Sequence, residues 1–221
     1  MKKIKDLLDR IFIDGLSGMA QGLFATLIIG TIIQQIGTLV GGSTGDMIYA
    51  VGKVAAALTG AGIGVGVAAK FKESYLVVVS AATAGMVGAF ASKLLAGTVL
   101  VDGTMVFAGP GEPLGAFLAA YIGIECGHLV AGRTKVDILV TPIVTIGTGS
   151  LVGLLVGPGV SKIMTSLGAM INWGVEQQPF LMGIVVSVLM GMILTLPISS
   201  AALGIILNLS GLAAGAATVG C

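Results

Sequence analysis

The last part of the chain, residues 177–221, contains no charged side chain, and shorter apolar runs of the same kind fill most of what precedes it. The mean hydropathy of the whole chain is +1.08, and only 10% of its residues are charged. A soluble domain of this size does not have enough interior to cover so much apolar surface. Lipid is therefore the expected solvent for most of the protein.

The form of these apolar runs indicates helices. A span needs ~20 apolar residues to cross the ~30 Å hydrocarbon core, and in lipid only helices or closed barrels satisfy all their backbone hydrogen bonds. The runs are long and do not alternate between polar and apolar residues, as barrel strands do. We expect an all-α fold, a polytopic transmembrane helical bundle with about six to seven membrane segments and with re-entrant and interfacial elements.

The chain is expected to form one membrane domain over residues 1–221. An interfacial amphipathic helix is predicted for residues 1–13, where charged and apolar residues mix without a cleavage site. Another is predicted for residues 161–178, where apolar residues at helical spacing accompany a tryptophan. Residues 97–113 combine an apolar stretch with a Gly-Pro turn, which is typical of a re-entrant segment. The predicted spans are residues 16–40, 47–69, 75–96, 114–132, 138–156 and 180–196, followed by an apolar segment at 201–221.

Cations are found in every second loop between these spans. Four lie within residues 1–10, and pairs follow the second span (Lys70, Lys72) and the fourth span (Arg133, Lys135). The intervening loops carry acidic residues instead. This alternation is what the positive-inside rule requires of a multi-pass protein with a cytoplasmic N-terminus.

Glycine is unusually frequent, with 36 residues, and it recurs in pairs spaced four apart. Lipid tails give helices no hydrophobic reason to associate, so close backbone approach through small residues is how membrane helices pack. We predict that these glycines pack helices against one another. They are Gly18 and Gly22, Gly62 and Gly66, Gly123 and Gly127, and Gly149, Gly153 and Gly157.

Two ionisable residues, Glu125 and His128, lie three positions apart within the fourth predicted span. This spacing puts both on one face of a helix. If the helix starts at Pro113, the pair lies roughly 16 Å into it, near mid-membrane. Ionisable groups at that depth mark functional sites by default. We predict that the pair binds solute hydroxyl groups or relays a proton; a polar clamp between helices is the alternative.

A third candidate, Glu112, closes a turn at residues 109–111 just before Pro113, which suits the first position of a helix. A carboxylate there can reach into a cavity while the free N–H groups of the helix end face substrate oxygens. The alternative is a solvated residue in an outer turn. Lys53 and Lys93 lie near the outer ends of their spans and are candidates to pair with it. The predicted substrate-binding residues are thus Glu112, Glu125 and His128.

The sequence carries none of the common enzyme motifs: no P-loop, dinucleotide fingerprint, nucleophile elbow or His-Glu-x-x-His. We therefore expect no catalytic residue and no cofactor. A metal site is not expected either, because Glu125, Cys126 and His128 are neighbours on one helix and cannot all face one ion. A net charge of +1 gives no indication of a nucleic-acid partner.

Two segments carry a family resemblance. Residues 108–142 read AGPGEPLGAFLAAYIGIECGHLVAGRTKVDILVTP, and residues 171–221 read INWGVEQQPFLMGIVVSVLMGMILTLPISSAALGIILNLSGLAAGAATVGC. They resemble the membrane-embedded IIC component of bacterial sugar phosphotransferase systems, in the branch often found as a stand-alone IIC protein. The first hundred residues fit that family in hydropathy and glycine content. Members of the family continue further, so the chain resembles the N-terminal portion of a longer protein.

The resemblance implies a permease, not an enzyme, that carries a sugar or polyol-like solute inward by alternating access. A separate IIB subunit would phosphorylate the solute, and the permease would be a homodimer in the bacterial plasma (inner) membrane. A second interpretation is a non-transporting membrane interaction or regulatory subunit whose polar residues are helix clamps. An intramembrane enzyme would need a second polar cluster facing Glu125.

Overall fold

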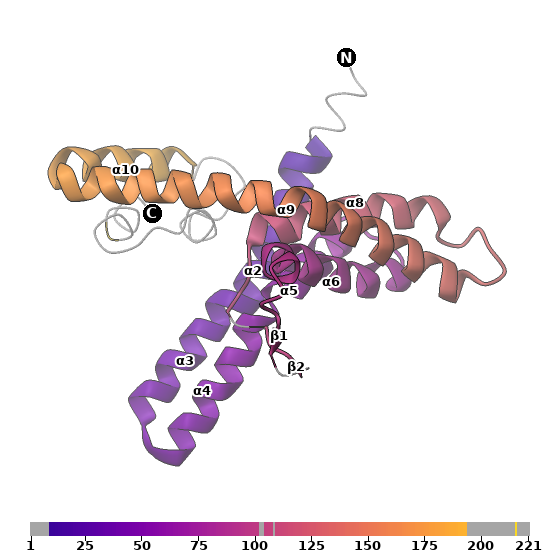
Figure 1. The fold of residues 1–221 in the computed structure, drawn as a ribbon, viewed down its shortest axis with the longest axis horizontal. Helices are drawn as coiled ribbons and strands as arrows, with labels where there is room; N and C mark the ends of the chain where they lie inside the picture. Colours follow the sequence, from indigo (N-terminus) through magenta and orange to yellow (C-terminus); the bar gives the residue numbers. More distant parts are fainter. Residues whose placement is uncertain (1–8, 102–103, 108, 194–214, 216–221) are drawn as a thin grey trace.

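The computed structural model describes residues 9–101, 104–107, 109–193 and Gly215, and nearly all of them are helical (Figure 1). The predicted all-α membrane architecture is confirmed. Within the described part, three helices are long and apolar enough to cross a membrane, or four if one bent pair counts as a single span. The predicted segment at 201–221, apart from Gly215, lies outside the described residues.

The first predicted span is one long helix from Arg10 to Val40. It consists of a π-helical turn η1 (Arg10–Gly15), α2 (Leu16–Leu23), a second π-helical turn η2 (Phe24–Ile28) and α3 (Ile29–Val40). Gly41, with φ +65°, ends it because a residue with a Cβ rarely adopts that conformation. Residues 10–13, assigned by the sequence to an interfacial helix, form the start of this helix. Residues 1–8 lie outside the described part, so the interfacial position stays a prediction.

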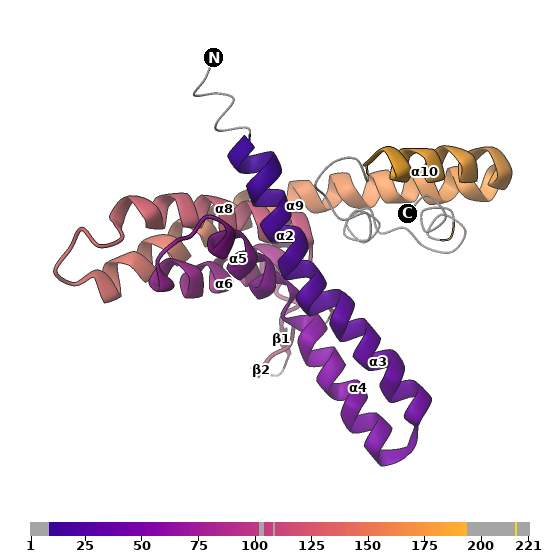
Figure 2. The ribbon, with the colours of Figure 1, turned by 180° about the vertical axis from the view of Figure 1, so that it is seen from behind.

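The second predicted span is bent. Helix α4 (Gly42–Ala57) runs back along α3, and the chain turns by 53° at Leu58 before α5 (Thr59–Lys70) begins. As a result α3 and α4 form a hairpin that projects from the rest of the molecule, whereas α2 packs on α5 within the bundle (Figure 2).

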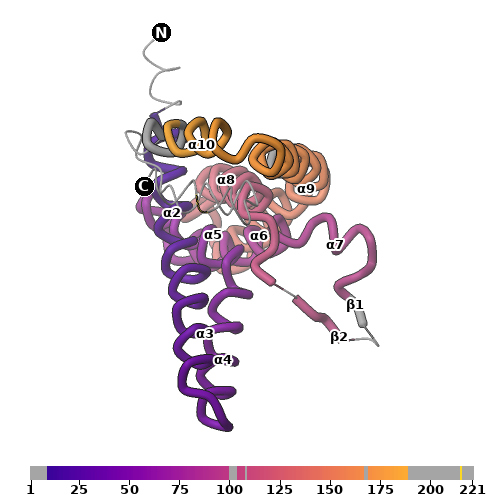
Figure 3. The backbone as a smooth tube through the Cα atoms, turned by 90° about the vertical axis from the view of Figure 1, so that its left-hand side faces the viewer, coloured from indigo at the N-terminus to yellow at the C-terminus, as the bar shows by residue number. Residues whose placement is uncertain are grey.

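The third span is shorter than the sequence predicted. Helix α6 (Tyr75–Ala89) breaks at Phe90, and a short helix, α7 (Ala91–Leu95), follows. The chain then forms a small antiparallel hairpin of β1 (Leu100–Val101) and β2 (Thr104–Met105) beside the bundle (Figure 3). These strands and the turn after them occupy the predicted re-entrant segment, whose position in the membrane stays a prediction.

The bundle is completed by α8 (Pro113–Val130), which begins at the predicted proline, and by α9 (Asp137–Gln177). Helix α9 joins the predicted fifth span and the predicted interfacial helix 161–178 into one helix of roughly 60 Å at 1.5 Å per residue. Its first part packs on α6 and α8, and α10 (Pro179–Ile193) folds back beside its last part (Figure 1).

Close glycine contacts hold the helices of the bundle together, as the sequence predicted. A Cβ on Gly18 would lie 2.7 Å from the carbonyl oxygen of Gly66, and a Cβ on Gly22 would collide with the backbone of Gly62. A Cβ on Gly123 would lie 2.6 Å from the carbonyl oxygen of Thr145 in α9. Large apolar residues such as Leu39, 86% exposed, cover the outside. In a membrane protein such residues face lipid.

Candidate functional site

The turn before α8 places Glu112 against the break between α6 and α7. The backbone N–H of Glu112 donates a hydrogen bond of 2.7 Å to the carbonyl oxygen of Ala89. Gly111 permits this approach, because its φ is +73° and a Cβ there would lie 2.7 Å from the Ala89 side chain. The position of Glu112 is therefore fixed by close contacts with Ala89 at the end of α6.

The carboxyl group of Glu112 is only partly satisfied. Its Oε1 atom is buried and has no hydrogen-bond partner among the described residues. Burial raises the pKa of this carboxyl group above its ordinary value of 4.5, and a hydrogen bond from the backbone of Leu114 lowers it in part. A buried acceptor without a partner is costly, so this oxygen is ready to accept a hydrogen bond from a bound molecule.

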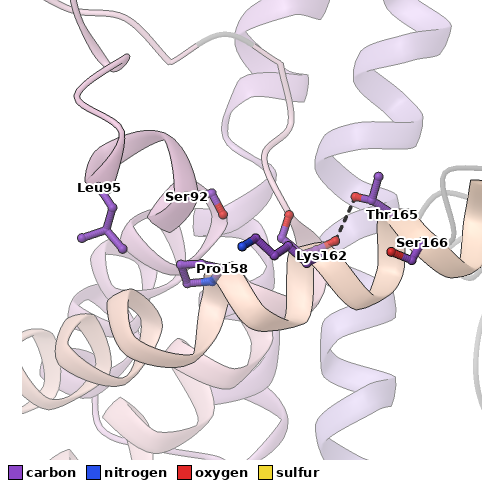
Figure 4. Close-up of a pocket in the computed structure, with 7 residues that line it drawn as sticks. Ser92, Leu95, Pro158, Lys162, Thr165 and Ser166 are labelled. Atoms are coloured by element: carbon purple, nitrogen blue, oxygen red, sulfur yellow. Dashed lines mark hydrogen bonds between the residues drawn. The ribbon is translucent and has the colours of Figure 1, made fainter.

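Two adjoining cavities lie next to this carboxyl group. The first, of about 250 Å³, is lined by the polar residues Glu112, Lys93, Ser92 and Ser161 and by Ala89, Pro110 and Gly111. The second, of about 550 Å³, shares Ser92 and Ser161 and extends along α9 (Figure 4). We call the two together the α7–α9 cleft. Its volume is in the range of small-molecule sites.

The walls of the α7–α9 cleft are rich in hydroxyl and ammonium groups. Along α9 they include Lys162, Thr165 and Ser166. The Thr165 hydroxyl donates a hydrogen bond of 2.8 Å to the carbonyl oxygen of Ser161 and can still accept one from a bound molecule. Lys162 lies along the cleft with its ammonium end toward Ser92 (Figure 4).

A second polar cluster lies near the other end of α8. The Arg10 Nε atom donates a hydrogen bond of 2.8 Å to Glu125, and its Nη2 atom lies 3.5 Å from Glu73. The other oxygen of Glu73 lies 2.9 Å from His128 Nδ1. Arg10 also stacks on the ring of Phe71, with 4.3 Å from Cζ to the ring centroid. We call Arg10, Glu73, Glu125 and His128 the four-residue ion cluster.

The four-residue ion cluster joins three parts of the chain: η1, the loop between α5 and α6, and α8. The side chain of Glu73 is 5% exposed, whereas that of His128 is 57% exposed. A carboxylate as buried as Glu73 needs polar partners, and it has the guanidinium group of Arg10 and the imidazole ring of His128. The cluster both fixes the first helix on the bundle and presents exposed polar atoms at this end.

The structure separates the three predicted site residues into two places. Glu125 and His128 belong to one cluster, whereas Glu112 lies roughly 20 Å away along α8 at 1.5 Å per residue. Of the two lysines considered as partners for Glu112, Lys93 lines the same cavity, and Lys53 lies over the ring of Tyr49 at 5.7 Å.

Sequence reasoning did not identify several residues of these two places. Arg10 was counted only among the N-terminal cations, although a cation at the start of the first span was a usable signal, and Glu73 was not considered. The cleft residues of α9 gave a weaker signal, because residues 161–178 were interpreted as an interfacial helix. Among these residues Lys162 gave a stronger signal, because it is a cation at the end of the bundle opposite the cationic loops.

The fold defines a multi-pass helical membrane protein. Residues 13–221 match the family described as phosphotransferase system, EIIC. The chain belongs to this family, whose members are the membrane-embedded permease components of phosphotransferase systems. No curated protein and no solved structure matches the chain significantly.

Proposed function

We propose that this protein carries a sugar or polyol-like solute inward by alternating access and that the solute first binds in the α7–α9 cleft. The family supports a permease-type transporter. The observation that carries the proposal is the buried Oε1 atom of Glu112, which lacks a partner among the described residues, on a side chain that lines a cavity together with Ser92 and Ser161. A carboxyl group of this kind is suited to accept a hydrogen bond from a solute hydroxyl.

The proposed orientation of the cleft in the membrane rests on the charge pattern. Lys70, Lys72, Arg133 and Lys135 lie in two loops at one end of the bundle, which the positive-inside rule assigns to the cytoplasm. The α7–α9 cleft lies at the other end of α6 and is therefore the outer site. In a bacterial plasma membrane it would meet solute arriving from outside.

We further propose that Glu125 and His128 bind the solute in an inward-facing state. His128 is more than half exposed and Glu125 about one-third exposed at the side chain. Opening of their ion pairs with Arg10 and Glu73 would free both groups for solute hydroxyls. A IIB subunit would then phosphorylate the solute at the inner face, and a homodimer is the proposed assembly.

Counterflow in proteoliposomes tests this function. The full-length protein should exchange radiolabelled D-mannitol, D-glucitol or D-glucose, and Glu112→Gln should reduce exchange at least tenfold because an amide oxygen accepts a hydrogen bond more weakly than an ionised carboxylate. Glu176→Gln is the matched control, since this exposed carboxylate does not line the cleft. Equal exchange by Glu112→Gln and wild type would exclude Glu112 as a solute contact.

The four-residue ion cluster favours a second candidate. Glu125 and His128 both contact charged residues from other elements, as a helix clamp would. In a non-transporting interaction or regulatory subunit these contacts would be purely structural. Absence of counterflow for the whole solute panel, with a stoichiometric membrane partner retained during purification, would support this candidate against the permease.

A further inference from the structure

The α7–α9 cleft contains two lysines although it lies at the end of the bundle away from the cationic loops. Apart from Lys53 in α4, the other cations among the described residues lie at the opposite end of the bundle, yet Lys93 and Lys162 both line the cleft. Glu112 is the one carboxylate among the residues that line the two cavities. With every group ionised, the cleft carries an excess of one positive charge.

The two lysines differ in what they already contact. Lys93 lies over the ring of Phe90, with its Nζ atom 5.4 Å from the centroid. Lys162 makes no hydrogen bond or ion pair with any residue in the described part of the chain, and it lies along the cleft with its ammonium end toward Ser92. This cavity is lined by four hydroxyl side chains as well as by Leu95 and Pro158, and an ammonium group beside such hydroxyls is arranged to meet an anion.

The location of Lys162 along α9 bears on its depth in the membrane. It lies 25 positions beyond Asp137, roughly 37 Å at 1.5 Å per residue, which is more than the ~30 Å of a hydrocarbon core. It therefore lies where its charge is solvated and where a solute arrives. A positive cleft at such a point raises the local concentration of anions.

We propose that the α7–α9 cleft selects hydroxylated anions of the sugar-acid class over neutral sugars, with Lys162 as the residue that recognises the anionic group. The hydroxyl groups of the solute would meet Ser92, Ser161 and the Glu112 carboxyl group, while its carboxylate lies against the Lys162 ammonium. This proposal rests on the proposed function, because it assigns the solute class of the same cleft.

D-gluconate and D-glucitol form a matched pair of probes. Both have six carbons and a chain of hydroxyls, and they differ at one end, where gluconate carries a carboxylate and glucitol a hydroxymethyl group. Titration calorimetry on the full-length protein in nanodiscs should show about tenfold tighter binding of gluconate, the gain typical of one charge-assisted hydrogen bond. This preference should shrink as the salt concentration rises.

Three variants make the test specific. Lys162→Met should remove the preference for gluconate and leave glucitol binding unchanged, while Lys162→Arg should keep it. Lys135→Met, which removes an exposed lysine at the opposite end of the bundle, is the control and should behave as wild type. An unchanged melting temperature shows that Lys162→Met is folded, as expected for an exposed position.

The outcomes separate the two proposals. Glucitol binding as tight as gluconate binding, still abolished by Glu112→Gln, overturns the anion preference and leaves the cleft as the solute site. A gluconate preference unaffected by Lys162→Met overturns the role of Lys162 as the residue that recognises the anionic group. Binding of neither probe overturns this inference together with the assigned cleft.

Discussion

The guanidinium group of Arg10 lies 2.8 Å from the carboxylate of Glu125, although 115 positions separate the two residues in the sequence. This contact ties the start of the first helix to α8, which Gly15 also approaches at the ring of Phe117. Both side chains are about one-third exposed, so the pair is neither a surface ion pair nor a fully buried one. Its contribution to stability should therefore exceed that of a surface pair only modestly.

A double-mutant cycle of Arg10→Gln and Glu125→Gln should give a coupling energy of about 1 kcal/mol. Thermal unfolding in detergent or nanodiscs provides the measurement. Arg133→Gln, at an exposed loop position, combined with Glu125→Gln is the control cycle and should be additive. A coupling energy of zero for Arg10 and Glu125 would show that the contact does not hold the first helix in place.

Replacement of Gly22 by valine should separate α2 from α5. The new Cβ would collide with the backbone of Gly62, and backbone atoms cannot move aside as a flexible side chain can. We expect a loss of roughly 2 kcal/mol or more in unfolding free energy, or failure to fold. Gly147→Val is the matched control, since a Cβ at Gly147 meets no atom within 4 Å. Equal stability of the two variants would contradict the close glycine contact.

The glycine contacts were predictable because the lipid environment leaves helices few other ways to pack. Spacing alone identified Gly18 with Gly22 and Gly62 with Gly66, and the structure places these pairs against each other. The start of α8 was predictable for a similar local reason, since Pro113 suits a first helical turn. Both inferences depend on neighbours in sequence or on a repeated spacing.

The polar contacts could not be predicted in the same way. Arg10, Glu73 and His128 meet only because the first helix crosses α5 and because the loop after α5 lies against α8. The bend at Leu58 could not be predicted, because neither a proline nor a charged residue lies at that position. Sequence reasoning named Glu112, Glu125 and His128 as solute ligands, and the structure places Glu112 at the opposite end of α8 from the other two.

The stability of the protein should depend on pH through Glu112. Burial raises the pKa of this carboxyl group in the folded state, so the folded state prefers the protonated form. Its contribution is fully present below the unfolded value of 4.5 and is lost as the pH rises through the raised folded pKa. Glu112→Gln keeps a neutral group of similar shape at every pH.

Melting temperatures of wild type and Glu112→Gln should be measured from below pH 4.5 to neutral pH. The two should therefore converge below pH 4.5 and diverge as the pH rises above 4.5. The variant should be the more stable protein at neutral pH, because the ionised carboxylate is the form that burial disfavours. Glu176→Gln, at an exposed position on α9, should run parallel to wild type. Parallel curves for Glu112→Gln would mean that this carboxyl group is solvated in the folded protein.

The orientation in the membrane can be tested with single cysteines in the full-length protein after Cys126→Ser and Cys221→Ser. Thr98→Cys lies after α7 and Lys135→Cys between α8 and α9, and both positions are exposed. A membrane-impermeant maleimide applied to intact cells should label Thr98→Cys only, because the positive-inside rule assigns the loops with paired cations to the cytoplasm. Inside-out vesicles should give the opposite pattern, and permeabilised cells should show both labelled. Labelling of Lys135→Cys in intact cells would reverse the topology and move the α7–α9 cleft to the inner face.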